Sequence, residues 1–297
     1  MNSLIVCNTG SDSISKIPLV MSLQENILYE EIFLTEGEKP LGPNGIYIKD
    51  RIAYIANNYS NSISMLNMDT LKEERTIYVG ANPNDLIGYD KYLYIVCSES
   101  NAVVLYDLNE EKVILEIKTN NWPYNIEISS KLNLLFITNF QSHNISVIDI
   151  KTNKIIGELV TLEYPTKVKV SNDGGFLYVC ESYMGDENEG YIEVFNLITL
   201  ESLGKIKVGK VPIDIYEDGG ILYVCNLMDS NIVLINKINL KKIREIHIGG
   251  MPRVLVKHEN IAYIGDYLNG RLVCLDLNNN NIKAITIGKE PNAMTFY

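Results

Sequence analysis

The sequence predicts an all-β fold, a seven-bladed β-propeller with four antiparallel strands in each blade. Three observations lead to this prediction. A proline recurs about every 40 residues, four short apolar runs fill each interval, and the two chain ends complement each other within one repeat. Repeats of this length that carry four strands are typical of propellers.

The recurring proline marks the start of each repeat. Seven of the nine prolines share one context, at spacings of 40, 40, 42, 47, 40 and 39 residues: Pro43, Pro83, Pro123, Pro165, Pro212, Pro252 and Pro291. Four of them follow the pattern G-x-x-P, which begins at Gly80, Gly209, Gly249 and Gly288. We expect the glycine to supply a turn with positive φ. We expect the proline to open a strand, because its missing N–H leaves no ladder donor unpaired there.

Four apolar runs follow in each repeat. In the third repeat they cover residues 84–89, 92–97, 102–107 and 112–118, and short polar turns separate them. The runs alternate apolar and polar residues and are rich in Val, Ile and Tyr, which favours strands over helices. Each repeat therefore predicts one four-stranded blade.

The ends of the chain predict how the ring closes. Only six residues follow Pro291, and they match a first strand, whereas the N-terminal LIVCN matches a second strand. The count from Pro291 through Tyr297 and on from Met1 to Asn8 is 14 positions, the same as from Pro43 to Asn57. We therefore expect one domain over residues 1–297, with residues 1–35 and 292–297 together forming the first blade. The C-terminal strand then joins the N-terminal blade and leaves no sheet edge free between blades.

Bulk composition excludes several classes of function. The formal net charge of −11 disfavours nucleic acid and anionic membrane surfaces as partners. The N-terminus lacks the features of a signal peptide, and no apolar window is long enough to span a membrane. The five cysteines are an odd number and lie in apolar runs, as expected of small buried residues in a reducing compartment. We expect a cytoplasmic monomer.

The segments that join the second and third strands resemble a known repeat family. They read IVCN-TGSDSISKI, YIAN-NYSNSISML, YIVC-SESNAVVLY, FITN-FQSHNISVID, YVCE-SYMGDENEGYIEVF, YVCN-LMDSNIVLI and YIGD-YLNGRLVCL. Together with the G-x-x-P step, they resemble the YVTN family of β-propeller repeats over essentially the whole chain. The resemblance implies the propeller fold. It implies no single activity, because such propellers serve both as binding scaffolds and as enzymes.

Two rings of candidate polar residues follow from the repeat. The last position of each second strand gives Asn8, Asn57, Cys97, Asn139, Glu181, Asn226 and Asp266. We interpret the asparagines first as caps of their own loops, and Glu181 and Asp266 as the informative departures. Two residues after each proline come Gly45, Asp85, Asn125, Lys167, Asp214, Val254 and Ala293. They are expected just inside the channel mouth, either as a site for a hard cation or polar molecule or as an internally paired lining, and we favour the lining.

Aromatic and large apolar residues gather on the loops of the same face. The candidates for a binding face are Trp122, Tyr124, Phe140, Tyr183, Met184, Leu227, Met228 and Tyr267. Loop-tip Tyr, Trp and Met are typical of protein- or peptide-binding surfaces, although about half of such residues are expected to be buried for structural reasons. Trp122, the single tryptophan, is the first candidate for a contact residue. The loop 182–190 adds Asp186, Glu187 and Glu189, which we interpret as a solvated acidic loop rather than a calcium site.

Catalytic motifs are scarce, and the sequence identifies no catalytic residue. The three histidines, His143, His247 and His258, fall at places in the repeat that cannot converge. We therefore favour a non-enzymatic scaffold that binds a protein, a peptide or a small ligand at the channel mouth, and we expect no cofactor. The alternative is a lactonase- or lyase-like enzyme. It would use Ca²⁺ or Mg²⁺ held at the mouth, with Glu181 and Asp266 as the first ligands and Asn226, Asp85 or Asp214 as others.

Overall fold

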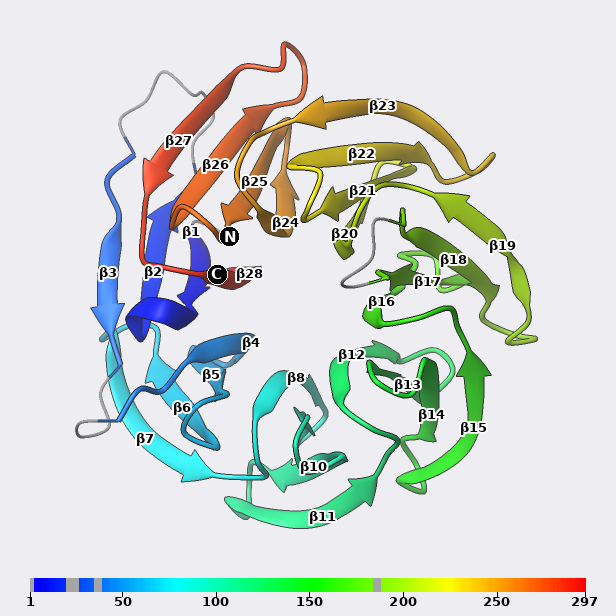
Figure 1. The fold of residues 1–297 in the computed structure, drawn as a ribbon. Helices are drawn as coiled ribbons and strands as arrows, with labels where there is room; N and C mark the ends of the chain where they lie inside the picture. The colour runs from blue at the N-terminus through cyan, green and yellow to red at the C-terminus, as the bar shows by residue number, and fades with distance from the viewer. Residues whose placement is uncertain (1–2, 20–26, 35–38, 184–187) are drawn as a thin grey trace.

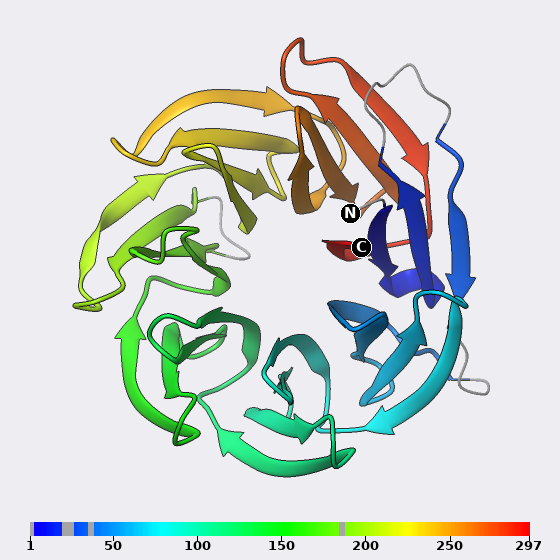
Figure 2. The ribbon, with the colours of Figure 1, turned by 180° about the vertical axis from the view of Figure 1, so that it is seen from behind.

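The computed structural model describes residues 3–19, 27–34, 39–183 and 188–297. Seven four-stranded antiparallel sheets form a ring (Figure 1), and the view from behind shows the same ring (Figure 2). The innermost strands line a central channel. The predicted seven-bladed propeller is confirmed. In each blade the first strand lies innermost and the fourth strand outermost.

We number the blades in chain order. Blade 1 contains β28 (Pro291–Phe296), β1 (Ser3–Asn8), β2 (Ser13–Pro18) and β3 (Glu30–Phe33), and a short 3₁₀ helix covers Thr9–Ser11. Blade 2 contains β4 (Pro43–Lys49), β5 (Ile52–Asn57), β6 (Ser62–Asn67) and β7 (Lys72–Tyr78). Blade 3 contains β8 (Pro83–Tyr89), β9 (Tyr92–Cys97), β10 (Ala102–Asp107) and β11 (Lys112–Lys118). Blade 4 contains β12 (Pro123–Ser129), β13 (Leu134–Asn139), β14 (Asn144–Asp149) and β15 (Lys154–Val160).

The remaining three blades follow the same plan. Blade 5 contains β16 (Pro165–Val170), β17 (Phe176–Glu181), β18 (Tyr191–Asn196) and β19 (Ser202–Lys207). Blade 6 contains β20 (Pro212–Asp218), β21 (Ile221–Asn226), β22 (Asn231–Asn236) and β23 (Lys241–His247). Blade 7 contains β24 (Pro252–His258), β25 (Ile261–Asp266), β26 (Arg271–Asp276) and β27 (Ile282–Thr286).

Burial explains the composition of the strands. The two middle strands of each blade are covered on both faces, so β9 and β10 are almost entirely apolar and buried. The outermost strand β11 is exposed along most of its length. The core consists of clusters between adjacent blades, and all five cysteines are buried and unbridged within them. This is the predicted role of the cysteines.

The ring closes where the sequence predicts. Strand β28 pairs antiparallel with β1, with Leu4 opposite Phe296 and Val6 opposite Met294. The backbone N–H of Ser3 donates to the carbonyl of Tyr297 over 3.1 Å, and the N–H of Tyr297 donates back over 2.9 Å. The C-terminal strand therefore completes the blade that the N-terminus begins.

The glycine of the G-x-x-P step has the predicted positive φ in one of the four repeats and a different role in the other three. Of the four, only Gly249 has positive φ. A Cβ at Gly209 would lie 2.7 Å from Asn226 Nδ2, and a Cβ at Gly288 would lie 2.6 Å from Asn8. At Gly80, Gly209 and Gly288 the glycine is therefore needed for close approach of the backbone to the neighbouring second strand, whereas Gly249 has the predicted positive φ. Positive φ instead belongs to the residue directly before the proline in six repeats: Gly42, Asn82, Trp122, Tyr164, Val211 and Glu290.

A bulge at the start of each inner strand aims side chains at the channel. The pairing of first and second strands shifts register directly after the proline in blades 2 to 7, for example between Pro83 and Asp85. A bulge redirects the extra residue. The residues one and two positions after the proline consequently both reach the cavities described below. Among the described residues, no helix is long and apolar enough to cross a membrane.

Candidate functional site

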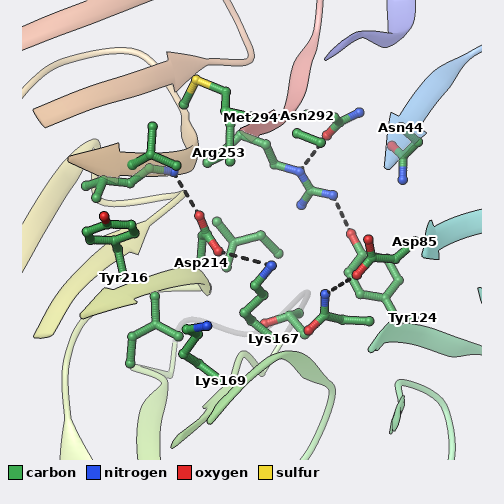
Figure 3. Close-up of a pocket in the computed structure, with 18 of the residues that line it drawn as sticks. Asn44, Asp85, Tyr124, Lys167, Lys169, Asp214, Tyr216, Arg253, Asn292 and Met294 are labelled. Atoms are coloured by element: carbon green, nitrogen blue, oxygen red, sulfur yellow. Dashed lines mark hydrogen bonds and ion pairs between the residues drawn. The ribbon is translucent and has the colours of Figure 1, made fainter. Parts of the chain in front are cut away.

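Two cavities follow one another along the channel. The outer one, which we call the mouth cavity, has a volume of about 380 Å³ and lies among the loops that precede the inner strands. The second, the inner cavity, has a volume of about 280 Å³ and is shown in Figure 3. Five residues line both cavities and separate them: Asn44, Asn84, Tyr124, Arg253 and Asn292. Each is the residue directly after a repeat proline.

Hydrogen bonds connect these five residues into a layer. Asn44 donates through Nδ2 to Asn84 Oδ1 over 2.8 Å, and Asn84 donates to the carbonyl of Tyr124 over 2.6 Å. Asn292 accepts from Arg253 Nε over 2.7 Å. It donates to Thr9 Oγ1 over 2.6 Å, and Thr9 in turn donates to the carbonyl of Pro43, beside Asn44.

Arg253 completes this layer. Its Nη2 donates to the hydroxyl of Tyr124, which brings a side chain of blade 7 to one of blade 4 (Figure 3). The guanidinium carbon lies 5.9 Å from the centroid of the Tyr124 ring. No ion pair joins Arg253 to a carboxylate within the described part of the chain. Arg253 is therefore a half-buried cation that only neutral side chains hold in place.

The inner cavity is polar and internally paired. Lys167 lies 3.5 Å from Asp214, and Lys169 lies 3.3 Å from Glu127. Asp85 accepts a hydrogen bond from Asn125. Burial lowers the pKa of Lys167, but the carboxylates of Asp214, Asp85 and Glu127 outweigh burial and raise this pKa above its ordinary value.

Three of these residues also connect neighbouring inner strands. Asp85 accepts from the backbone N–H of Ile126 over 3.3 Å, Asn125 accepts from Val168 over 3.0 Å, and Asp214 accepts from Leu255 over 2.8 Å. Burial is the main cause that raises the pKa of Asp85. This arrangement corresponds to the internally paired lining that we favoured, because each side chain satisfies backbone donors of the next blade.

The mouth cavity has aromatic walls. The predicted candidates Trp122, Tyr124, Leu227 and Tyr267 line it, together with Tyr59. Trp122 has φ 56°, and its backbone N–H donates to Asn101 Oδ1 over 2.8 Å. Its carbonyl accepts from the N–H of Phe140, also over 2.8 Å. Because Tyr164 and Val211 share this conformation, it belongs to the repeat and holds the tryptophan at the rim.

The other predicted face residues lie beside the mouth cavity or away from it. The ring of Phe140 packs 5.6 Å from Tyr124 and 4.9 Å from Tyr164, measured between centroids. Tyr183 lies 6.4 Å from Tyr191 in blade 5, and Met228 is 58% exposed on a loop of blade 6. Met184 lies outside the described residues, as do Asp186 and Glu187.

The asparagines at the ends of the second strands are buried within their blades. Instead of capping the loop, the amide nitrogen of Asn57 donates to Ser62 and Ser64 on the third strand, over 3.2 and 2.8 Å. Asn139 and Asn226 bond in the same way to Asn144 and Asn231. Each has no exposed surface and lies behind the channel lining.

Asp266 replaces the asparagine with a charge that the blade neutralises. It accepts from the N–H of Met251 over 3.0 Å, from Asn269 over 2.8 Å and from Arg271 over 2.6 Å. Burial raises the pKa of Asp266, but these hydrogen bonds and the arginine charge leave it below its usual value.

Glu181 replaces the asparagine with a carboxyl that is poorly neutralised. It accepts from the N–H of Leu162 over 2.8 Å and lies 3.5 Å from Lys205, which also pairs with Glu193. Burial, with the adjacent Glu193 carboxyl, raises the pKa of Glu181 to about 8.

Neither Glu181 nor Asp266 lines the two cavities, although both were the first candidates for a metal at the mouth. Within the part of the chain that the structure describes, no group of three or more His, Cys, Asp or Glu side chains is arranged to hold a metal ion. His143 also has a structural partner, because its Nδ1 accepts from the N–H of Tyr164 over 3.1 Å. Among the described residues, the side chains that line the mouth cavity include no carboxylate, so they do not fit a divalent cation there.

Sequence reasoning missed the layer between the cavities. Arg253, Asn44, Asn84 and Asn292 were not candidates, because alternation directed attention to the second residue after each proline. A signal was present, since the repeats read PNG, PND, PYN, PTK, PID, PRV and PNA, with a side chain able to hydrogen-bond directly after six of the seven prolines. A bulge brings this position to the channel, and no sequence motif predicts that bulge.

Comparison with known proteins establishes the fold alone. No family model and no curated protein matches the chain. A functionally unknown protein from Desulfotomaculum acetoxidans DSM 771 is similar in structure, with a TM-score of 0.82 and 14% identity over 99% of this chain and 98% of that one. Hydrazine synthase from Kuenenia stuttgartiensis matches with a TM-score of 0.77 and 16% identity over 87% and 90% of the two chains.

Virginiamycin B lyase from Staphylococcus aureus is also similar, with a TM-score of 0.69 and 17% identity over 83% of this chain and 85% of that one. These solved structures therefore include proteins named as enzymes and one without a known function. A shared propeller supports many activities, so the site and not the fold has to decide the function.

Proposed function

We propose that this protein is a non-enzymatic binding scaffold of the YVTN repeat type, which works in the cytoplasm and recognises a protein or peptide at the mouth cavity. The observation that carries the proposal is the aromatic wall of Tyr59, Trp122, Tyr124 and Tyr267 beside Arg253, the one cation among the described residues that line this cavity. Aromatic and arginine side chains dominate the energy of binding interfaces. A cavity of about 380 Å³ accepts a short peptide segment or a small ligand, not a folded domain.

The rigidity of the site supports recognition. The mouth is built on inner strands that hydrogen-bond from blade to blade. At the rim, the backbone N–H of Trp122 donates to the Asn101 side chain, and its carbonyl accepts from the N–H of Phe140. A preorganised surface loses little side-chain entropy on binding, which favours affinity from a small contact area.

Peptide display against the immobilised protein tests this proposal. Peptides that bind the wild type are then measured against Trp122→Ala and Tyr267→Ala. Loss of either aromatic anchor is expected to weaken binding roughly 10- to 100-fold. Phe33→Ala is the matched control, because Phe33 is an aromatic residue on the outer strand β3 with 64% exposure. Binders that are insensitive to both mouth variants would contradict the proposal.

A second candidate is an enzyme of the lactonase or lyase type, and the shared fold with virginiamycin B lyase is the observation that favours it. Glu181 and Asp266, the first candidates for metal ligands, are held inside their blades, so we derive no metal-dependent step. Thermal unfolding with EDTA and with Ca²⁺, Mg²⁺ or Mn²⁺ tests this candidate directly. A cation that binds the folded state at a hundred times its dissociation constant adds about 2.7 kcal/mol of stability. We expect no such rise.

A further inference from the structure

We propose that Arg253 anchors a carboxylate at the channel mouth, so that the ligand of this site ends in a carboxylate beside an apolar or aromatic group. A peptide C-terminus and a small aromatic acid share this chemistry. The inference rests on the proposed binding function and names the chemical class that the mouth cavity selects.

The wall of the mouth cavity carries one positive charge and no negative charge among its described residues. Of the described residues that line the mouth cavity, Arg253 alone is charged, and the others are amides, aromatic rings, Thr9, Leu227 and Met251. A half-buried guanidinium without an acidic partner is costly, because burial removes part of its hydration. An anionic ligand is the partner that would compensate this cost.

The contrast with the neighbouring cations strengthens this argument. Lys167 and Lys169 line the inner cavity and are paired with Asp214 and Glu127. Arg271, in the same blade as Arg253, is paired with Asp266. Arg253 instead contacts an amide oxygen of Asn292 and the hydroxyl of Tyr124.

The guanidinium of Arg253 keeps hydrogen-bond donors for a ligand. A guanidinium carries five N–H groups. Asn292 and Tyr124 each accept from one of them, and they hold the planar group across the channel (Figure 3). Three N–H groups remain without a hydrogen-bond partner in the described part of the chain. The planar guanidinium is thereby oriented before a ligand binds. It suits a planar carboxylate, which accepts two parallel hydrogen bonds from a pair of N–H groups.

The charges along the channel set the depth at which an anionic ligand is stable. Three carboxylates line the inner cavity (Asp85, Glu127 and Asp214), against two lysines (Lys167 and Lys169) that are paired with two of them. Among its described residues, the inner cavity therefore offers no unpaired cation to a ligand carboxylate that passed Arg253. On the outer side, Trp122, Tyr267 and Tyr59 form aromatic walls suited to the apolar part of the ligand. The Glu290 carboxylate, whose charge helps to raise the pKa of Tyr267, does not line the mouth cavity. One cation among neutral amides matches a single negative charge better than a phosphate dianion.

The only tryptophan of the chain gives the test a built-in probe. Trp122 lines the mouth cavity, so a ligand that enters the cavity changes its fluorescence. Two pools of the same N-acetylated short peptides are titrated, one with free C-terminal carboxylates and one with C-terminal amides. Benzoate and phenylacetate, compared with benzamide, distinguish a small aromatic acid from a peptide C-terminus.

The expected result is a response to the free-acid pool and a response weaker by roughly 10- to 100-fold to the amide pool, the range for a hydrogen bond to a charged group. Arg253→Gln should lose this preference, and Arg253→Lys, which keeps the charge but not the fork, should lose part of it. Arg244→Gln is the control, since Arg244 lies on the outer strand β23. A response to the small acids equal to that of the peptides would support the inference and identify a small carboxylate as the ligand.

Three outcomes would overturn the inference: equal responses to acid and amide pools, an unchanged preference in folded Arg253→Gln and Arg253→Lys, or no response to any carboxylate at millimolar concentration. These outcomes leave the binding scaffold separately testable. If displayed peptides lose binding in Trp122→Ala but bind equally with a C-terminal amide, the proposed function stands and the carboxylate inference is wrong. If displayed peptides bind Trp122→Ala and Tyr267→Ala as tightly as the wild type, both the proposed function and the carboxylate inference are wrong.

Discussion

Arg253 on the inner strand of blade 7 donates a hydrogen bond to the hydroxyl of Tyr124 on the inner strand of blade 4. These two side chains divide the channel, because both line the mouth cavity and the inner cavity. An arginine that crosses the channel to reach a neutral partner is positioned for binding and contributes little ion pairing to the fold.

The two arginines of blade 7 should therefore differ in their effect on stability. Arg271→Gln leaves the buried Asp266 carboxylate without its cation, so we expect a loss of about 3 kcal/mol in the free energy of unfolding. Arg253→Gln removes an unmatched charge and should change stability by less than about 1 kcal/mol. Urea denaturation of both variants measures the difference. Equal losses would contradict the assignment of Arg253 to binding.

The buried Glu181 should make stability depend on pH. Its pKa of about 8 in the folded state exceeds the ordinary value of 4.5, because burial and Glu193 disfavour the charged form. Glu181 therefore makes its full contribution to the free energy of unfolding below about pH 4.5, where its carboxyl is protonated. This contribution is lost as the pH rises toward 8.

Urea denaturation from pH 5 to pH 8 measures this loss, which we expect to be on the order of 3 kcal/mol. In Glu181→Gln, the free energy of unfolding should depend less on pH over this range. Glu201→Gln, an exposed carboxylate in the same blade, should leave it as in the wild type. A profile of the Glu181 variant that matches the wild type would show that Glu181 is not the group responsible.

The substitution of glycine by alanine is expected to have opposite effects on stability at two positions. Gly209→Ala places a Cβ 2.7 Å from Asn226 Nδ2 and should lower stability by about 1–3 kcal/mol, the usual cost of overpacking. Gly157 lies on the outer strand β15, and its added Cβ meets no atom within 4 Å. Gly157→Ala should be neutral or stabilising by up to about 1 kcal/mol. Thermal unfolding of the pair checks the prediction, and a destabilised Gly157→Ala would contradict it.

The closure of the ring predicts tolerance to circular permutation. Ser3 and Tyr297 are joined by two backbone hydrogen bonds, so a short linker between the ends should preserve blade 1. New ends opened at the exposed turn between Asn109 and Glu110 should yield a folded propeller. Deletion of residues 291–297 should instead prevent cooperative unfolding, because blade 1 loses its innermost strand. Circular dichroism and thermal unfolding compare the two proteins, and a fully stable deletion would refute this account of closure.

The fold was predictable because each repeat expresses the same local rules. Seven prolines, alternating runs and the match between Pro291 and Asn8 are all properties of the linear sequence, and blade packing preserves them. The aromatic wall was partly predictable for the same reason, since Trp122 and Tyr267 occupy loop positions that the repeat assigns to one face.

The polar part of the site was not predictable from the pattern. Asn57 looks like a loop cap in the sequence, but packing between blades buries it against the third strand. Arg253 sits at a position that strict alternation would turn away from the channel, and a bulge after Pro252 returns it. Local periodicity carries no information about such a register shift, nor about whether a given charge, such as that of Asp266, finds a partner in the folded chain.

The most direct test of the account is a crystal structure of the protein with a displayed peptide that binds it. We predict that the peptide enters the mouth cavity between Trp122 and Tyr267, with its terminal carboxylate on the guanidinium of Arg253. A peptide bound on the opposite face or along an outer strand, with the mouth cavity free of it, would contradict the central claim.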